Sequence, residues 1–174
     1  MLEACTLLES WTCKEKACEF GKLMRPGEIR CPMREFHAWL NSSASEAAPY
    51  AGGQWTATTV SGCASGDCTY DIPTYLSATE WTDALYAFRA SATPENFPML
   101  TWEKDIGFTG DSDSPQLKYM SVTAKMTMKL LQAVTVKDPI EERAEKYVKA
   151  ISKPAAAKTV WQYSFDWTWS ATQT

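Results

Sequence analysis

The sequence predicts an α+β fold: a mostly antiparallel sheet with two helices packed on one face, and a cysteine-containing extension at the N-terminus. Two stretches, residues 117–134 and 159–170, predict the sheet, because apolar and polar residues alternate there with the period of a strand. The helices are predicted by apolar residues at helical spacing that follow capping residues at Ser77 and Asp138. Strands and helices that mix in this way along one chain are typical of the class.

The N-terminal segment, residues 1–50, is expected to contain a helix, a short hairpin and a second short helix. Residues 2–12 have apolar side chains at helical spacing, and the pair Pro26-Gly27 predicts the turn of the hairpin. The second helix is expected from three apolar residues, Phe36, Trp39 and Leu40.

A stretch of small residues at 41–53 is the best candidate for a linker to the main domain, residues 54–174. The main domain opens with "QWTATTV" at 54–60, which is rich in the residues that favour strands. The following "TYDIPTYL" is expected to be an edge strand, because Pro73 lacks the backbone N–H that a central strand needs.

A helix is predicted over 78–90, since Ser77 and Glu80 have the spacing of a capping box. A strand at 98–104 and a polar loop should follow. The strand at 117–134 is the clearest in the chain, because from Met120 to Leu130 its even positions are apolar and its odd positions are polar. The apolar positions are Met120, Val122, Ala124, Met126, Met128 and Leu130.

The second helix of the main domain is predicted over 139–152. Asp138 is a good N-cap, Pro139 suits the first helical position, and Glu141 lies near the positive end of the helix dipole. A last strand is predicted at 159–170, where every second residue is a large aromatic. These are Trp161, Tyr163, Phe165, Trp167 and Trp169.

Composition excludes several classes of function. The chain has 174 residues and a formal net charge of -4, so it lacks the basic surface of a general nucleic-acid binder. No signal peptide is evident, and no apolar run is long enough to span a bilayer. We therefore expect no membrane partner and synthesis in a cytoplasm, where stable disulfides are uncommon.

Four residues have side chains that suit a tetrahedral zinc ion: Cys13, Cys18, Cys31 and His37. The spacing of the first pair is wider than the usual two-residue knuckle, so free thiols and, less readily, disulfides are alternatives. The turn between Cys63 and Cys68 could bring those two sulfurs together, but we expect unpaired thiols there.

An enzyme is not expected. His37 is the only histidine, and no nucleophile elbow, phosphate loop or dinucleotide fingerprint occurs in the chain. The row of aromatics in the last strand has three explanations: a buried core face, a subunit contact or a platform for sugar rings. The core is the commonest use of such a row. Trp167 and Trp169 are the candidates for a contact with a neighbouring subunit.

The second half of the chain resembles tail-terminator and related neck or tail-completion proteins of tailed bacteriophages. The resemblance is one of element order over about residues 78–170. It lies in the strand "FPMLTW", the long strand "SVTAKMTMKLLQAV", the capped helix "DPIEERAEKYVKAI" and the strand that follows.

The resemblance implies a virion structural protein with no enzymatic activity, made in the host cytoplasm. No cofactor is expected, apart from the zinc ion considered above. Such proteins form homo-oligomeric rings that terminate the tail and join it to the head, next to other neck and tail proteins. Two alternatives remain open. One is a binding module stabilised by zinc, and the other is a carbohydrate-binding protein that uses exposed tryptophans.

Overall fold

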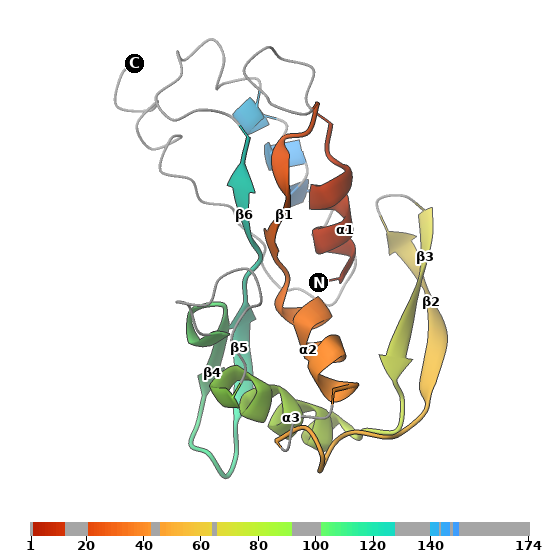
Figure 1. Cartoon of the computed structure of the whole chain (residues 1–174), viewed down its shortest axis with the longest axis vertical. Coiled ribbons are helices and arrows are strands. Elements are labelled where there is room, and N and C mark those ends of the chain that lie inside the picture. The colour runs from red at the N-terminus through yellow and green to blue at the C-terminus, as the bar shows by residue number, and fades with distance from the viewer. Residues whose placement is uncertain are drawn as a thin grey trace.

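The computed structural model describes residues 2–12, 21–42, 46–63, 66–91 and 102–127, together with residues 140–142, 144–146 and 148–149. The helices are α1 (Leu2–Ser10), α2 (Pro32–Leu40) and α3 (Ala78–Ser91), with a 3-10 turn, η1 (Trp102–Lys104). The strands are β1 (Met24–Arg30), β2 (Trp55–Cys63), β3 (Gly66–Pro73), β4 (Ile106–Thr109), β5 (Gln116–Met120) and β6 (Thr123–Met126). The fold class is α+β, as the sequence predicts (Figure 1).

All pairings among the described strands are antiparallel, and they form three two-stranded sheets. β2 pairs with β3 and β4 pairs with β5, each a hairpin of neighbours in the chain. The third pair is non-local, because β1 lies beside β6, with Arg30 opposite Thr123. This pairing joins the N-terminal segment to the second half of the chain.

The strand expected over 117–134 is interrupted, and this prediction is corrected. β5 ends at Met120, β6 begins at Thr123, and the two strands pair with different partners. At the interruption the carboxylate of Asp105 accepts hydrogen bonds from the hydroxyls of Ser121 at 2.9 Å and Thr123 at 3.3 Å. The residues after Thr127 in this prediction lie outside the described ones.

Two further local predictions were wrong. The strand expected at 98–104 is the 3-10 turn η1 in its described part, because the amide of Asp105 donates to the carbonyl of Trp102. The turn expected at Pro26-Gly27 lies inside β1, where the register with β6 shifts. Gly27 has a φ of 75°, a backbone conformation that glycine adopts without steric cost.

The helices predicted at 2–12, around Trp39 and at 78–90 are confirmed by α1, α2 and α3. The capping box of α3 forms as expected. The amide of Ser77 donates to the Glu80 carboxylate at 2.8 Å, and the amide of Glu80 donates to the Ser77 hydroxyl at 3.3 Å. These bonds lower the pKa of Glu80 below its ordinary value.

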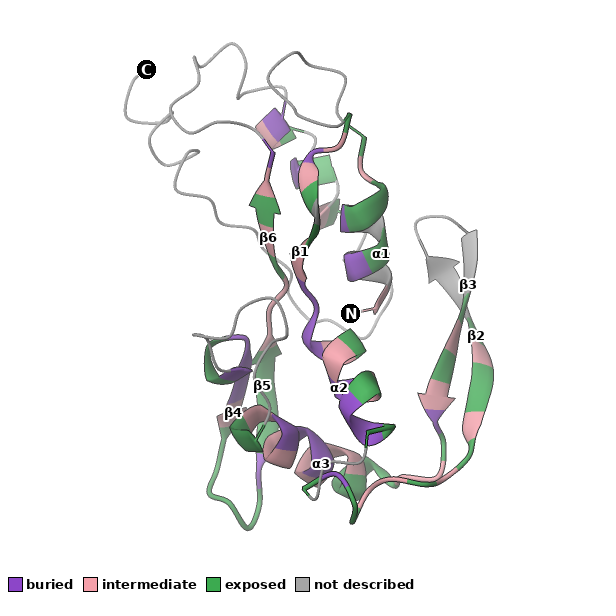
Figure 2. Cartoon of the chain, in the orientation of Figure 1, coloured by how far each residue is buried: buried purple, intermediate pink, exposed green. Residues whose placement is uncertain are grey.

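The main core lies between α2 and α3 and is closed by η1 and β4 (Figure 2). Its fully buried side chains come from both sides of the linker expected at 41–53, and Ala47 within that stretch is itself buried. The aromatic members are Phe36, Trp39, Phe88 and Trp102. The division of the sequence into 1–50 and 54–174 therefore does not coincide with a division of the core.

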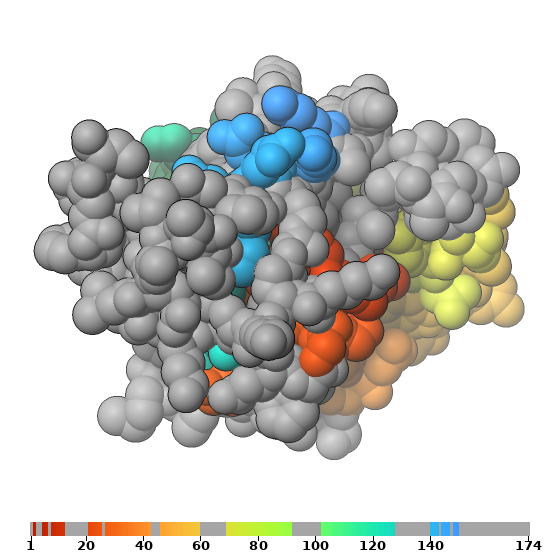
Figure 3. Space-filling model, turned by 90° about the horizontal axis from the view of Figure 1, so that it is seen from above, coloured from red at the N-terminus to blue at the C-terminus, as the bar shows by residue number. Residues whose placement is uncertain are grey.

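A second, smaller cluster joins Leu23 to Ile140, with Trp11, Met24 and Met126 packed against it. Ile140 belongs to the helix predicted over 139–152, whose described residues are helical. Viewed from above, these residues lie next to the N-terminal segment (Figure 3). The strand predicted at 159–170 lies outside the described residues.

Candidate functional site

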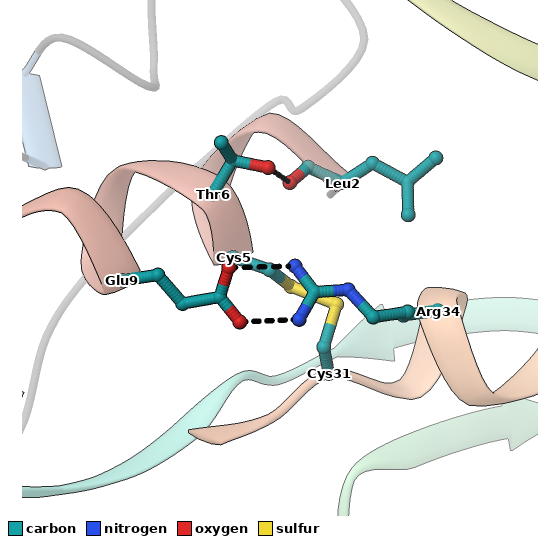
Figure 4. The surroundings of a disulfide bond; sticks show 6 residues. All are labelled: Leu2, Cys5, Thr6, Glu9, Cys31 and Arg34. Atoms are coloured by element: carbon teal, nitrogen blue, oxygen red, sulfur yellow. Dashed lines mark hydrogen bonds and ion pairs between the residues drawn. A yellow bond between two sulfur atoms is a disulfide. The ribbon is translucent and has the colours of Figure 1, made fainter. Parts of the chain in front are cut away.

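The most constrained side chains of the N-terminal segment surround a disulfide. Cys5 of α1 is bonded to Cys31, the residue that precedes α2, across 26 positions of sequence and with 6.0 Å between the Cα atoms. Both residues are buried. Beside them, Glu9 and Arg34 form a two-pronged ion pair between the same two helices, with 3.1 Å between Oε2 and Nη2 (Figure 4). The bond and the ion pair together fix α1 against the start of α2.

The disulfide runs against the expectation, based on synthesis in a cytoplasm, that stable disulfides are uncommon in this chain. It also bears on the zinc hypothesis, because a zinc ligand must be a thiolate and the sulfur of Cys31 is bonded to another sulfur. Cys13 and Cys18 lie outside the described residues. Within the described part of the chain, no group of three or more His, Cys, Asp or Glu side chains is placed to hold a metal ion.

His37, the fourth candidate ligand, is packed among aromatic rings. It lies on α2, and its ring makes an edge contact with Trp55 of β2, with 4.9 Å between the ring centroids. It is partly buried, and this burial lowers the pKa of His37 below its ordinary value of 6.5. The contact joins α2 to the base of the β2–β3 hairpin.

A buried ion pair joins β1 to the residue that follows η1. Arg30, the last residue of β1, pairs with Asp105, and the two side chains are only 4% and 6% exposed. The guanidinium carbon of Arg30 lies 5.0 Å from the centre of the Trp102 ring, a cation–π contact. The Asp105 carboxylate also accepts the hydroxyls of Ser121 and Thr123. The pair therefore ties β1, η1 and the β5–β6 break together.

The β2–β3 hairpin stands at the side of the molecule, and its two strands cross, so that β2 is the outer strand near the base (Figure 1). Its base is anchored: Pro73 is buried, Trp55 packs against the main core, and the hydroxyls of Thr56 and Thr74 lie 2.9 Å apart. Further along the hairpin, two cross-strand pairs are exposed on one face. These are Ala57 with Asp71 and Thr59 with Thr69.

Cys63 and Cys68 lie near the tip of this hairpin. In the backbone register Cys63 is opposite Gly66 and Cys68 is opposite Val60, so the two cysteines are not direct cross-strand partners. The candidates for a subunit contact, Trp167 and Trp169, lie outside the described residues, and so the expected aromatic contact stays a prediction.

A polar hollow of about 370 Å³ lies between the start of α3 and residues 113–115. Two carboxylates and several hydroxyls line it, and no histidine or cysteine does. Its lining includes Thr79, Thr82, Asp83, Asp113 and Ser114. This is not the arrangement of a nucleophile with a neighbouring base.

Two buried interactions were not predicted from the sequence, the Cys5–Cys31 disulfide and the Arg30–Asp105 ion pair. The even number of cysteines, six, was the available signal for a disulfide. No sequence signal identified Arg30, because its partner is 75 residues away.

None of the helices among the described residues has the length and apolar character needed to cross a membrane. Comparison of the chain with protein-family models, with curated proteins and with solved structures found no match.

Proposed function

We propose that the protein is a structural subunit that assembles with copies of itself. The ring at the neck or tail of a tailed bacteriophage is the assembly that the resemblance of its second half implies. The observation that supports this proposal is the β2–β3 hairpin, which stands apart from the other described strands and has exposed cross-strand pairs.

A two-stranded hairpin has little stability of its own in water, because it has no third strand or helix to cover its faces. Hairpins of this kind are suited to contacts between subunits, where the partner covers them. The rest of the fold is suited to carrying such an arm, because a disulfide and a buried ion pair connect elements that are distant in sequence.

The proposal is tested by the mass of the purified chain in solution, measured by light scattering over a range of micromolar concentrations, together with electron microscopy of the same sample. We expect a mass that is a multiple of the 19.4 kDa of one chain, and particles of uniform size. A monomer at all concentrations, with no particles visible, would contradict self-assembly.

The particular assembly needs a separate test. We expect the genes beside this one to encode portal, tube or sheath proteins, and rings in the electron micrographs. Self-assembly without rings would retain the structural role and remove the phage neck or tail as its place.

A further inference from the structure

The two strands of the β2–β3 hairpin differ in what their open edges offer. Each has one edge that faces its partner and, in the described part of the chain, no third strand pairs with the other edge. An open edge presents unpaired N–H and C=O groups, which form a template for another strand.

The edge of β3 is protected by its own residues. β3 contains Asp67, Asp71 and Pro73 within eight residues. Proline has no N–H to donate to a neighbouring strand, and charged residues disfavour pairing of one edge with another. Asp71 is also exposed, so a second copy of β3 placed beside the first would bring like charges together.

The edge of β2 has no such protection. Its nine residues, "WTATTVSGC", include no charged residue and no proline. Four of the nine are threonine or valine, which favour strands. In Figure 1 the two strands of the hairpin cross, and β2 is the outer strand in the lower part of the hairpin, near its base.

We infer that the occupant of this edge is β2 of a second copy of the chain, paired antiparallel, so that the two hairpins form one sheet in the order β3–β2–β2–β3. This inference rests on the proposed function, since it names the surface through which the chain assembles. An uncharged strand is complementary to itself, because its antiparallel pairing places no like charges opposite each other.

The threonines of β2 suit this partner. Across the β2–β3 hairpin, the hydroxyls of Thr59 and Thr69 already lie 3.2 Å apart, a cross-strand contact between two threonines. Pairing of two β2 strands brings the threonines of "TATT" near those of the second copy, where the same kind of contact forms.

The symmetry of the β2–β2 contact limits the size of the oligomer that it can form. A contact that uses the same surface on both subunits closes after two copies, so its product is a dimer. A ring would then consist of dimers joined by a second contact elsewhere on the chain.

The test compares two double variants on the same face of the hairpin. Ala57→Lys with Thr59→Lys places two positive charges on β2, and Thr69→Lys with Asp71→Lys places two on β3 directly opposite. All four positions are exposed, so both variants should keep the melting temperature of the unmodified chain within a few degrees.

We expect the β2 variant to weaken self-association at least about tenfold in Kd by sedimentation, because charges on β2 then meet the same charges of the second copy. The Kd of the β3 variant for self-association should lie within about threefold of that of the unmodified chain.

Self-association that is unchanged in the β2 variant, or lost only in the β3 variant, overturns the β2–β2 contact and leaves the proposed function standing. An unmodified chain that stays monomeric overturns both. If either variant fails to fold, the concentration dependence of hydrogen exchange in the unmodified chain decides the question.

Discussion

The β2–β3 hairpin and the rest of the described elements, which we call the body (α1, β1, α2, α3, η1, β4, β5 and β6), are held together by different interactions. The body contains a buried disulfide, a buried ion pair and a core of interlocking aromatic rings. The hairpin is anchored at its base by Trp55 and Pro73, and beyond the base its contacts include the backbone ladder and a pair of threonine hydroxyls.

Because of this difference, we expect the body to account for the stability of the chain and the hairpin to account for its self-association. Burial and covalent linkage account for the stability of the body, so changes there should alter the free energy of unfolding. The exposed face of the hairpin contributes little to that free energy, so its exposed residues can be used for a partner without cost to the fold. Substitutions in the two regions should therefore affect different measurements.

The largest effect on stability is expected from Asp105→Ala. It leaves the guanidinium of Arg30 buried without its counter-charge, which costs about 3–5 kcal/mol in the free energy of unfolding. Urea denaturation measures this loss. The matched control is Glu9→Ala, which removes the exposed Glu9–Arg34 pair and should cost about 1 kcal/mol or less. If both variants lost the same free energy of unfolding, burial would not explain how much each ion pair contributes to stability.

The next effect is expected from the double variant Cys5→Ala with Cys31→Ala. Loss of a cross-link over 26 residues should lower the free energy of unfolding by about 3–4 kcal/mol, mainly because the unfolded chain gains freedom. Mass spectrometry of the unmodified chain, alkylated before reduction, should find the Cys5 and Cys31 peptides linked. Recovery of both as alkylated thiols would contradict the bond.

A smaller effect is expected from pH. Burial holds the pKa of His37 below its ordinary value of 6.5, so the unfolded chain takes up this proton more readily than the folded one. Neutral His37 therefore makes its full contribution to the free energy of unfolding above pH 6.5, and this contribution falls as the pH drops through that value. The melting temperature should therefore fall between pH 7.5 and 5.5 by more in the unmodified chain than in His37→Gln. An identical fall in both would assign the pH dependence to other groups.

The smallest effect on stability is expected from Thr59→Ala in the hairpin. It removes an exposed hydroxyl pair, and the free energy of unfolding should change by no more than about 0.5 kcal/mol. Thermal unfolding measures this value. A loss comparable with that of Asp105→Ala would show that the hairpin is part of the cooperative core.

Local signals in the sequence predicted local structure well. Ser77 and Glu80 predicted the start of α3, because both hydrogen bonds of the capping box lie within four residues. The β-forming residues of "QWTATTV" predicted β2, and its partner β3 follows within a few residues. In both cases the stabilising contacts are close in sequence.

Features that depend on distant residues were not predictable in the same way. The alternation of apolar and polar residues runs through Ser121 and Val122 without a break. In the structure, however, β5 ends at Met120, and the hydroxyls of Ser121 and Thr123 donate to Asp105, which is 16 and 18 residues away. Likewise, six cysteines allow fifteen complete pairings, and nothing in the spacing selects Cys5 with Cys31. The open edge of β2 depends on which strands pair in the fold, and the residues of β2 alone do not specify that pairing.

The central claim is that the body is stable by itself while β2 is a contact surface, and amide hydrogen exchange at two protein concentrations tests it most directly. The concentrations should lie on either side of the self-association midpoint. We predict that amides of β2 exchange more slowly at the higher concentration, because the second copy accepts their hydrogen bonds, while amides of α3 exchange equally at both. If the chain associates and the exchange of β2 is the same at both concentrations, the assembly uses another surface and the claim is contradicted.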